Sequence, residues 1–324
     1  MMDTSKVNSL MRIVELYELL RTEGEVNAEQ IALDYNKHVE TIKKDIRFIK
    51  AALGTSGPEI RYDSNKKLYK FEEDPDRLFY CFILLTILYG SRSLPLQDLH
   101  HLTEFIFNSL KASERLQIKK ITESYNANYV PMIQNAVLDC IRELYACILS
   151  QNIVEITYTN NDLATTTFPI APLSIAYDEG YFYCIAYKNW DSEQPQIRNY
   201  RIDRILGYRK KRKKFTKLLD GSRFFEAGKY ANLSFMMHSG ERIIHATIRV
   251  KPFIANHLKS KFPVHRFLRK ENDHEVYQVT VSHEESLLFW LLQQRTWAQV
   301  LSPQSLRDKM KEAIIDLARM YDVT

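Results

Sequence analysis

Three arginines at regular spacing are the residues of this chain that packing alone explains least. Arg198, Arg201 and Arg204 lie along an aromatic and aliphatic segment that otherwise resembles a buried strand. A guanidinium group stays charged and binds carboxylates or phosphates through paired hydrogen bonds. Several of them in an apolar segment require an anion, so the spacing predicts a site for a phosphate-bearing ligand or nucleic acid.

Strand alternation does not place the three arginines on one face. Arg198 and Arg204 share a face with Tyr200, whereas Arg201 points the other way beside Asp203. All three meet one ligand only if the strand bends or lies at a sheet edge. In the alternative interpretation, Arg201 and Arg204 pair with carboxylates of the chain itself, namely Asp203 and either Glu179 or Glu155.

A run of six basic residues, Arg209 to Lys214, follows the arginine segment directly. Between Arg198 and Lys214 there are nine basic residues and one acid, whereas the whole chain has a net charge of only +5. A local cluster of cations attracts polyanions more strongly than a modest overall charge does. Two interpretations remain open, because like-charged runs are also common in solvated loops.

Catalytic arrangements are not evident in the sequence. It contains no GxSxG, P-loop or HExxH motif, and His100-His101 is the only adjacent pair among nine scattered histidines. Glu284 and Glu285 follow His283, but two acids at the start of a helix are favoured there by the helix dipole. We therefore expect no enzymatic activity, no metal site and no cofactor.

The N-terminal segment has the pattern of three helices. In residues 4–22, an apolar stripe is expected at Leu10, Ile13, Val14, Tyr17 and Leu20, and Gly24 ends the helix. Asn27 is expected to cap a short second helix, and a third runs from Val39 to Leu53. The third helix buries aliphatic residues and exposes a polar, mostly basic face at Thr41, Lys43, Lys44, Arg47 and Lys50.

A short hairpin follows this three-helix unit. Strands are expected at residues 59–62 and 68–71, and their turn carries Lys66 and Lys67. A basic helix enters a major groove and a basic hairpin tip contacts the DNA backbone in winged helix-turn-helix proteins. The alternative is a small three-helix domain with solvated lysines.

Residues 76–150 have a helical pattern throughout. Helices are expected at 78–90, 99–110, 115–125 and 132–149, and Cys140 and Cys147 are expected to pack on one face. The segment Leu78 to Tyr89 is too apolar for a solvent-facing helix. We expect it to be buried in its own bundle or against a second copy of the chain.

From Asn152 the period changes to that of strands. Candidates at 153–159, 165–170, 173–177, 181–187 and 197–206 predict a small, strongly bent β-barrel. In the fourth candidate, Phe182, Cys184 and Ala186 form the expected core face, which leaves Tyr183 on the opposite face. The remainder, 242–301, has the order β-α-β-β-α-β, the split βαβ pattern.

The last helix is expected to begin at a Ser302 cap with Pro303 in its first turn. Its apolar stripe is expected at Leu306, Met310, Ile314, Leu317 and Tyr321. The four cysteines lack CxxC spacing, which favours a reducing compartment, and the longest apolar run is too short to span a membrane. We therefore expect a cytoplasmic protein without a membrane segment.

The order of these parts resembles the WYL-domain transcriptional regulators of bacteria. The residues that carry the resemblance are Pro172-Leu173, Phe182-Tyr183-Cys184, Arg198, the segment Tyr200 to Ile205, and Val300-Leu301-Ser302-Pro303 with Leu306-Arg307. Phe182 and Cys184 replace the eponymous Trp and Leu, and a glycine usual just before Val300 is absent. The resemblance implies an α+β protein with five parts: a winged helix-turn-helix (1–74), a helical linker or dimerisation region (75–150), an Sm-like WYL barrel (151–216), a connector (217–241) and a ferredoxin-like WCX domain (242–324).

The resemblance also implies a function. Such a protein is a homodimeric regulator, most often a repressor, that binds a double-stranded DNA operator and senses a nucleic-acid fragment or nucleotide-like effector. The implied ligand residues are Tyr183, Arg198, Arg201 and Arg204, with Tyr158 as a further addition. The alternative function is a nucleic-acid-binding accessory protein of a nuclease or phage-defence system without an operator of its own.

Overall fold

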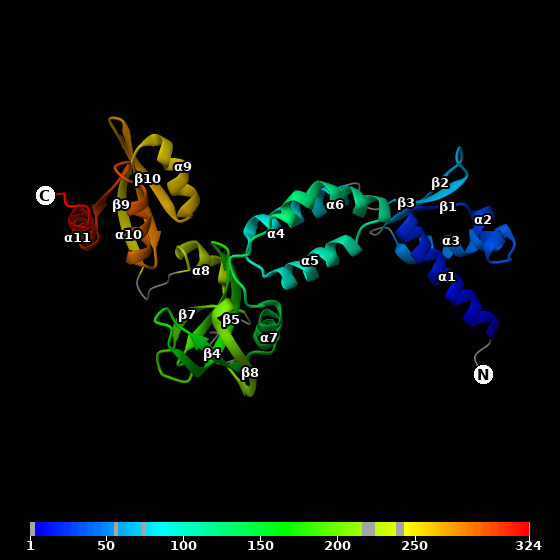
Figure 1. Ribbon diagram of the computed structural model, residues 1–324, viewed down its shortest axis with the longest axis horizontal. Helices are drawn as coiled ribbons and strands as arrows, with labels where there is room; N and C mark the ends of the chain where they lie inside the picture. Colours follow the sequence, from blue (N-terminus) through cyan, green and yellow to red (C-terminus); the bar gives the residue numbers. More distant parts are fainter. Residues whose placement is uncertain (1–3, 55–57, 73–75, 216–223, 238–242, 324) are drawn as a thin grey trace. The chain divides into compact units, whose positions relative to one another are not determined.

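The chain forms a multidomain α+β protein (Figure 1). The computed structural model describes residues 4–54, 58–72, 76–215, 224–237 and 243–323. These fall into two compact units, Met1–Ile133 and Gln134–Thr324, each with helices and an antiparallel sheet. The coarse α+β prediction is therefore confirmed, whereas the expected strand start at Arg242 and parts of the connector 217–241 lie outside the described residues.

Three helices build the N-terminal core, as the sequence predicted. They are α1 (Thr4–Glu23), α2 (Ala28–Asp34) and α3 (Val39–Leu53). Gly24 ends α1 with a φ of 80°, and its N–H donates to the carbonyl of Leu20. The side chain of Asn27 accepts hydrogen bonds from the N–H groups of Glu29 and Gln30, so the predicted cap is confirmed.

The predicted apolar stripe of α1 is wrong in part. Leu16 and Leu20 are fully buried, whereas Leu10 and Val14 are more than half exposed. The buried residues recur at a spacing of four and include Arg12, because the stripe is rotated toward an ion pair with α3. Apolar periodicity alone did not indicate that a charged residue belongs to the buried face.

The hairpin also forms as predicted, with one addition. Strands β2 (Glu59–Asp63) and β3 (Leu68–Glu72) are antiparallel, and the two-residue β1 (Glu25–Val26) adds to β3 to give the order β1-β3-β2. Ile60 and Phe71 pack into the same core as the helices. The hairpin is thereby fixed to the three-helix unit.

Three helices complete the first unit: α4 (Arg77–Ser91), α5 (Leu96–Asn108) and α6 (Ala112–Ala127). The expected helix at 132–149 begins only at Leu138, as α7 (Leu138–Ser150). Pro131 disfavours helical backbone in Val130, the residue before it, so α6 does not continue into this segment. Helix α7 lies in the second unit, where it packs on the sheet that follows.

The second unit contains a five-stranded antiparallel sheet, in the order β7-β6-β5-β4-β8. The strands are β4 (Asn152–Thr159), β5 (Thr165–Asp178), β6 (Tyr181–Lys188), β7 (Gln196–Arg201) and β8 (Ile205–Lys214). Two expected strands are one strand, β5, with a bulge between Pro172 and Ser174. Proline has no N–H for the ladder, so a bulge at this position is its usual setting.

The expected strand at 197–206 is wrong, because it divides into two. Strand β7 ends at Arg201, a 3-10 turn covers Ile202–Arg204, and β8 then pairs with β4 instead of β6. The basic run is therefore an extended edge strand and not a loop. Strand parity cannot be carried across this turn.

Both faces of β6 are covered. Cys184 and Ala186 are fully buried on the predicted core face, and Ile185 is equally buried on the other. Tyr183 and Tyr187 pack with Ile185 against Met237 and Tyr230, from the segment that follows the sheet and contains α8 (Ala227–Leu233). The predicted division into one core face and one open face is therefore wrong.

The C-terminal part has the predicted order of elements. They are β9 (Ile244–Val250), α9 (Pro252–Lys261), β10 (His265–Glu271), β11 (His274–Val281), α10 (Glu284–Gln293) and β12 (Ala298–Ser302), with sheet order β10-β11-β9-β12. Both central strands contribute to a core that also contains Trp290 and Phe262. The predicted β-α-β-β-α-β order is confirmed.

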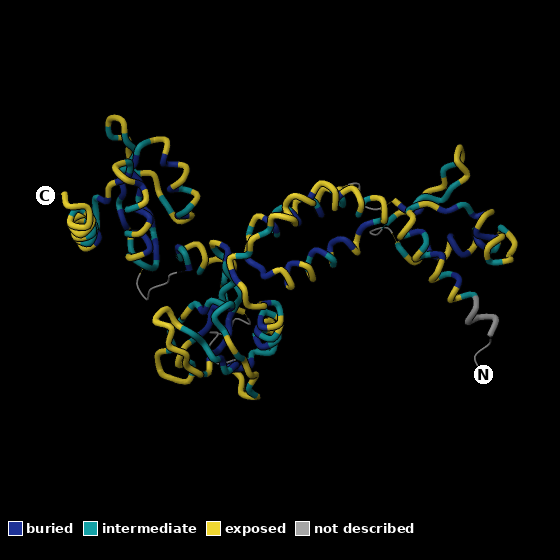
Figure 2. Tube along the Cα trace, in the orientation of Figure 1, coloured by how far each residue is buried: buried dark blue, intermediate teal, exposed yellow. Residues whose placement is uncertain are grey.

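The last helix, α11 (Gln304–Met320), differs from its prediction in two respects. Its N-cap is Pro303 and not Ser302, and no side chain caps it. Leu306 is buried, but Ile314, Leu317 and Tyr321 are exposed, and Figure 2 shows α11 as mostly exposed. Only the first turns of the predicted stripe reach the core.

Candidate nucleic-acid and ligand interfaces

The outer face of α3 carries the predicted cations. Lys44, Arg47 and Lys50 are exposed, while Thr41 and Lys43 are half-buried. Ile42, Ile46 and Ile49 anchor the opposite face in the core. Because helical side chains repeat every 3.6 residues, the same periodicity that buries the isoleucines directs the cations outward.

The cations of α3 differ in their own partners. Lys43 donates to Glu40 at 2.8 Å, and this hydrogen bond raises the pKa of Lys43. Lys50 lies 4.0 Å from Glu59 of β2, and the Lys44 ammonium lies 5.7 Å from the centroid of the exposed Phe48 ring. Within the residues that the structure describes, Arg47 has no ion pair. It is the cation of α3 most available to an outside anion.

The hairpin tip presents Lys66 and Lys67. Both are exposed in the four-residue turn between β2 and β3, and Lys67 has a φ of 55°. The Asp63 carboxylate shapes the turn by accepting the N–H groups of Asn65 and Lys66, and it also binds Lys70 at 2.8 Å. Lys66 and Lys67, which were predicted to contact DNA, therefore lie in a turn that Asp63 stabilises, with their ammonium groups in solvent.

A buried ion pair fixes the outward face of α3 from behind. Arg12 of α1 donates to Asp45 of α3 at 2.6 Å, and both side chains are at most 10% exposed. Sequence reasoning missed this pair. The available signal was Asp45 itself, which interrupts the row of isoleucines on the buried side of α3.

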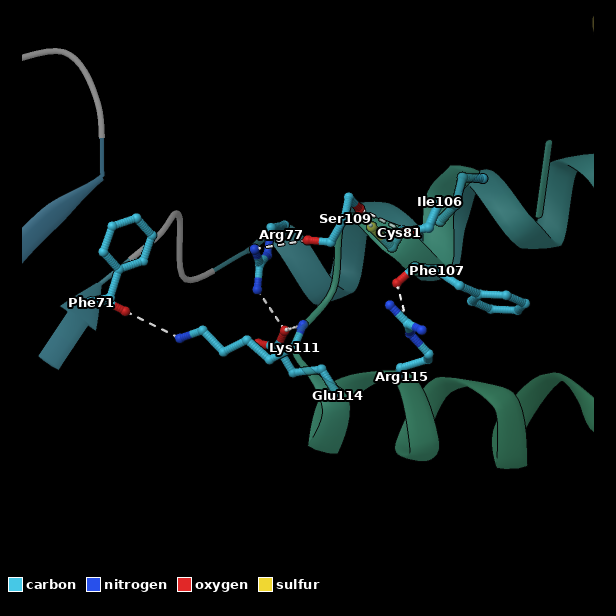
Figure 3. Close-up of polar contacts among 9 residues, drawn as sticks. All are labelled: Phe71, Arg77, Cys81, Ile106, Phe107, Ser109, Lys111, Glu114 and Arg115. Atoms are coloured by element: carbon cyan, nitrogen blue, oxygen red, sulfur yellow. Dashed lines mark hydrogen bonds and ion pairs between the residues drawn. The ribbon is translucent and has the colours of Figure 1, made fainter. Parts of the chain in front are cut away.

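Three side chains connect the hairpin to the helices that follow it (Figure 3). The Lys111 ammonium donates to the carbonyl of Phe71, the last buried residue of β3, at 3.1 Å. Arg77 of α4 binds Glu114 of α6 at 2.5 Å and the carbonyl of Ser109 at 3.0 Å. Hydrogen bonds and an ion pair thus connect the end of β3 and the starts of α4 and α6.

In the second unit, the structure does not bring the three predicted arginines together. Arg198 donates to Gln196, Arg201 to Asp203, and Arg204 to Asn161 in the turn between β4 and β5. Among the described residues, no hydrogen bond or ring contact joins one of the three to another. The alternative interpretation holds for Arg201 only.

Arg201 is the most constrained of the three. Its guanidinium binds both carboxylate oxygens of Asp203, at 2.7 and 3.1 Å, and lies 3.6 Å from the centroid of the Tyr181 ring. Burial lowers the pKa of Arg201, but the hydrogen bond to Asp203 and the charges of Asp203, Tyr181 and Tyr183 together outweigh burial and raise it. A bidentate pair under an aromatic ring positions this residue and leaves little of it for a ligand.

The two predicted tyrosines differ in their surroundings. Tyr183 lies opposite Arg201 in the β6–β7 register, and burial raises the pKa of its hydroxyl. Tyr158 packs edge-on against Tyr200 at 5.3 Å, and Phe168 also contacts Tyr200. Tyr158 and Tyr183 thus belong to two separate groups of aromatic side chains.

Sequence reasoning placed Tyr200 beside the arginines but gave it no role. Its ring is buried, and its hydroxyl is enclosed without a hydrogen-bond partner among the described residues. Burial raises the pKa of this hydroxyl, so it stays protonated and available as a donor. A buried hydroxyl without a partner is uncommon in folded proteins and is one reason to expect a ligand or water there.

Arg198 borders a cleft of about 560 Å³. Residues of β6, β7, α8 and the loop before β7 line it, together with one residue just before β9 and one just after β11. They are Tyr187, Gln194, Pro195, Gln196, Ile197, Arg198, Tyr230, Leu233, Ile243 and Ser282. One cation, two tyrosines and several amide and apolar groups suit a planar anionic ligand. Of the predicted ligand residues, this cleft contains Arg198 alone.

The basic edge strand β8 is the largest concentration of charge in the second unit. Glu155 of β4 binds Lys211 at 2.8 Å and lies 3.9 Å from Arg209. Lys213 lies 4.5 Å from the centroid of the Trp190 ring. The remaining three cations, Lys210, Arg212 and Lys214, are exposed and form no ion pair within the described part of the chain.

The acids at the start of α10 act at a helix junction. Lys309 of α11 binds Glu284 at 2.9 Å and also contacts Glu285, and Ser305 donates to Glu284 at 2.7 Å. The His283 ring accepts the N–H of Ser286 as the cap of α10. Across the described residues, no three His, Cys, Asp or Glu side chains are grouped as metal ligands, and no helix has the length and apolarity to cross a membrane.

The fold and its charges define a multidomain α+β protein with basic surfaces on α3, the β2–β3 tip and β8. Comparison with protein families matches residues 139–210 to the WYL domain and residues 242–318 to the WCX domain. The chain therefore contains a WYL domain and a WCX domain, which confirms the resemblance seen in the sequence. The WYL match begins within α7, so this helix, which packs on β4, β5 and β8, is part of the matched domain.

Two solved structures are similar to the chain at low identity. One is proteasome accessory factor B/C (PafBC) of Arthrobacter aurescens, with 16% identity, a TM-score of 0.35 and 97% of this chain covered. The match covers 48% of that protein, so the chain spans about half its length. The other is a CRISPR Cas-related protein, with 12% identity, a TM-score of 0.42, and coverage of 86% of this chain and 77% of that one. Among curated proteins, no sequence matches.

Proposed function

We propose that the protein is an effector-responsive transcriptional regulator that binds an operator in double-stranded DNA. The observation that carries this proposal is the outer face of α3, where Lys44, Arg47 and Lys50 project from a helix whose other face is anchored in the core. The hairpin that carries Lys66 and Lys67 at its tip packs into the same core through Ile60 and Phe71. A helix for the major groove and a tip for the backbone are the two parts of a winged helix-turn-helix.

The proposed domains are those expected from the sequence: 1–74, 75–150, 151–216, 217–241 and 242–324. The sheet order β10-β11-β9-β12 supports a ferredoxin-like C-terminal domain, because it follows from two split βαβ units. In the five-stranded sheet, β8, the last strand along the chain, pairs with β4, the first, and this order supports a small barrel in 151–216. The regulator would act in the cytoplasm as a homodimer whose reading heads lie about 34 Å apart, one turn of DNA.

The proposed effector is a nucleic-acid fragment or nucleotide-like molecule bound by the second unit. Arg198 and Arg204 keep hydrogen-bonding capacity, because among the described residues each has only a neutral amide as its partner. The enclosed Tyr200 hydroxyl supplies a donor without a partner in the described chain. Arg201, Tyr183 and Tyr158 would shape the site from behind. The regulator would be a repressor, and effector binding would release it from the operator.

Footprinting of the full chain on its own upstream DNA tests the DNA-binding part. The wild type is expected to protect a defined palindrome. A Lys44→Ala, Arg47→Ala variant should bind it about 10- to 100-fold more weakly. The matched control is Lys119→Ala, Lys120→Ala, which removes two exposed cations from α6 in the same unit. Equal losses in both variants would show that only net charge matters, and the proposal would fail.

A second candidate function has one observation in its favour. The unpaired cations of β8 lie in the second unit and do not depend on α3, so nucleic acid could bind there without any operator. The protein would then be an accessory factor of a nuclease or phage-defence system. Binding that ignores duplex sequence and survives the α3 variant would favour this candidate.

A further inference from the structure

Helix α4 has an unusual composition for a helix with an open side. Its 15 residues, RLFYCFILLTILYGS, contain one charged side chain, Arg77 at the start. Arg77 is engaged by Glu114 and by the carbonyl of Ser109. No charge is present on α4 beyond its first residue. No side of this helix therefore has the charged residues that are typical of a solvent-exposed face.

The buried side of α4 consists of a single row of residues. Cys81, Leu85 and Tyr89 recur at a spacing of four, and all three are buried. This row packs toward α5 and α6, the other helices of its bundle. One row of three residues accounts for less than half of the apolar side chains of α4.

The outer side is wider and is not covered by the described part of the chain. Phe79, Tyr80, Ile83, Leu84 and Ile87 are between 38% and 60% exposed. At 3.6 residues per turn they form one stripe, about 140° wide, centred nearly opposite the buried row. We call these five residues the α4 stripe. The sequence left open whether this helix is buried in its own bundle or by a second copy, and the bundle covers only one side.

We propose that the α4 stripe is the face through which two copies of this chain associate. This inference rests on the homodimer in the proposed function and names its contact surface. Five large side chains at these exposures present on the order of 500 Å² per copy, a patch of the size that marks an interface. Two such patches bury about 1,000 Å², the lower limit for a specific association.

A second copy fits the stripe better than a partner of different chemistry. In a two-fold interface each patch meets itself, so any charge within it would oppose a like charge. The stripe contains none, and it offers neither an ionic group nor a row of amides by which a different protein would be selected. An uncharged, self-matching surface is the requirement of an isologous contact.

In an antiparallel arrangement of the two α4 helices, the α4 stripe of one copy packs against that of the other along its length. Its middle lies near Ile83, so the two-fold axis passes close to that residue, and Phe79 meets Ile87 of the partner subunit. The helix dipoles then oppose one another favourably. Gly90 is exposed on the same side, and an added Cβ there would meet nothing of its own chain. Packing within the chain does not require a glycine at this position of the helix, but a glycine leaves room for the backbone of a partner subunit to approach.

A rival surface exists on α11. Ile314, Ile315 and Leu317 are exposed there, together with Met320 and Tyr321. This patch is interrupted by charges, since Lys311, Asp316 and Arg319 lie among the apolar residues. The rival supplies a matched comparison, because both patches contain exposed isoleucine and leucine residues on a helix.

Sedimentation of the full chain with three sets of variants tests the proposal. The wild type is expected to sediment as a dimer. Leu84→Glu, Ile87→Glu should raise the dimer dissociation constant by at least about 100-fold, because dimerisation would bury unpaired carboxylates. Ile314→Glu, Leu317→Glu on α11 and Phe105→Glu, Leu116→Glu on exposed sites of α5 and α6 are expected to remain dimeric. Far-UV circular dichroism establishes that each variant is folded.

Cross-linking provides a test that does not depend on disrupting the helix. Ile83→Cys should be joined to itself across the axis by a short bismaleimide, whereas Leu116→Cys should not. The four native cysteines are buried, and burial raises the pKa of Cys140 to about 12 and that of Cys147 to about 11, so they should not react.

Two results would overturn the proposal. One is a wild-type chain that stays monomeric at the highest concentration, and the other is a dimer that only the α11 variants disrupt. Operator footprinting on the same samples separates this failure from that of the proposed function. A monomer that still protects an operator refutes the α4 contact and leaves the regulator in place.

Discussion

The guanidinium of Arg201 and the carboxylate of Asp203 form a bidentate pair, two residues apart, at the point where β7 ends and the 3-10 turn begins. The pair is only 22% and 13% exposed, and Tyr181 covers it. It holds the chain at the turn that sends β8 to the far edge of the sheet. Arg201, which was predicted to bind a ligand, thus also positions the chain at this turn.

Replacing Arg201 should therefore reduce stability. Arg201→Ala leaves the Asp203 carboxylate without its partner, and the free energy of unfolding should fall by about 2 kcal/mol. Arg204→Ala removes a side chain bound to a neutral amide in an exposed turn and should change stability by less than about 0.5 kcal/mol. Urea unfolding of the full chain measures both. If Arg201→Ala is as stable as the wild type, the positioning role is wrong.

The Arg12–Asp45 pair should dominate the stability of the N-terminal core. Asp45→Ala leaves a buried guanidinium unpaired and should cost about 3 kcal/mol. The double variant Arg12→Met, Asp45→Leu replaces the pair with apolar side chains and should recover most of this loss. Thermal unfolding followed by circular dichroism compares the three proteins. A double variant no more stable than Asp45→Ala would contradict this account.

The hairpin tip and α3 should have different effects on DNA binding. Lys66→Ala, Lys67→Ala removes two backbone contacts, so affinity should fall equally for all sequences, and the slope of log K against log salt should decrease by about 1.8. Arg47→Ala should instead relax the preference for the operator over other DNA. Fluorescence anisotropy at several salt concentrations measures both. A tip variant that alters sequence preference would place Lys66 and Lys67 in a groove.

Local rules predicted much of the fold. The Asn27 cap, the Gly24 helix end and the β2–β3 hairpin all depend on residues within a few positions of one another. The order of elements in the C-terminal domain followed from periodicity in the same way. Such signals are contained in the sequence because the interactions that produce them are local.

The site was less predictable because it depends on contacts between distant residues. The parity argument for Arg198, Arg201 and Arg204 assumed one continuous strand, and the turn at Ile202 ended that strand. Tyr183 was expected on an open face, which α8 and Met237 cover from far along the chain. A charged residue such as Asp45 is usually exposed. It is buried here because it pairs with Arg12, 33 positions earlier in the chain.

Acid should loosen the contact between α10 and α11. Burial opposes ionisation of Glu284, but the Ser305 hydroxyl and the Lys309 ammonium stabilise the carboxylate more, so its pKa lies below the ordinary 4.5. A group with a lowered folded-state pKa contributes stability that is present above its unfolded pKa and is lost as the pH falls through the folded value. Glu284→Gln should thus lower the Tm by about 2–4 °C at pH 7. The difference from the wild type should vanish near pH 3, and an equal difference at both pH values would contradict the assignment.

The unpaired cations of β8 should bind a single-stranded nucleic-acid backbone. Lys210, Arg212 and Lys214 are exposed along an edge strand, and the half-exposed Tyr208 offers a ring on which a base can stack. Lys210→Ala, Arg212→Ala, Lys214→Ala should weaken binding of an oligonucleotide and reduce its salt slope by about 2, since each single-strand phosphate contact contributes about 0.7.

The control for this prediction removes the same charge elsewhere in the second unit. Arg266 and Lys270 are exposed and Lys259 is half-buried, and none of the three forms an ion pair among the described residues, so their replacement by alanine changes net charge equally. This control should leave the salt slope within about 0.5 of the wild-type value, because its cations do not lie along β8. Equal losses in the two triple variants would mean that binding follows overall charge. A DNA and an RNA oligonucleotide of the same sequence, measured side by side, would show which backbone β8 prefers, because only RNA offers a 2′-hydroxyl to the Tyr208 hydroxyl.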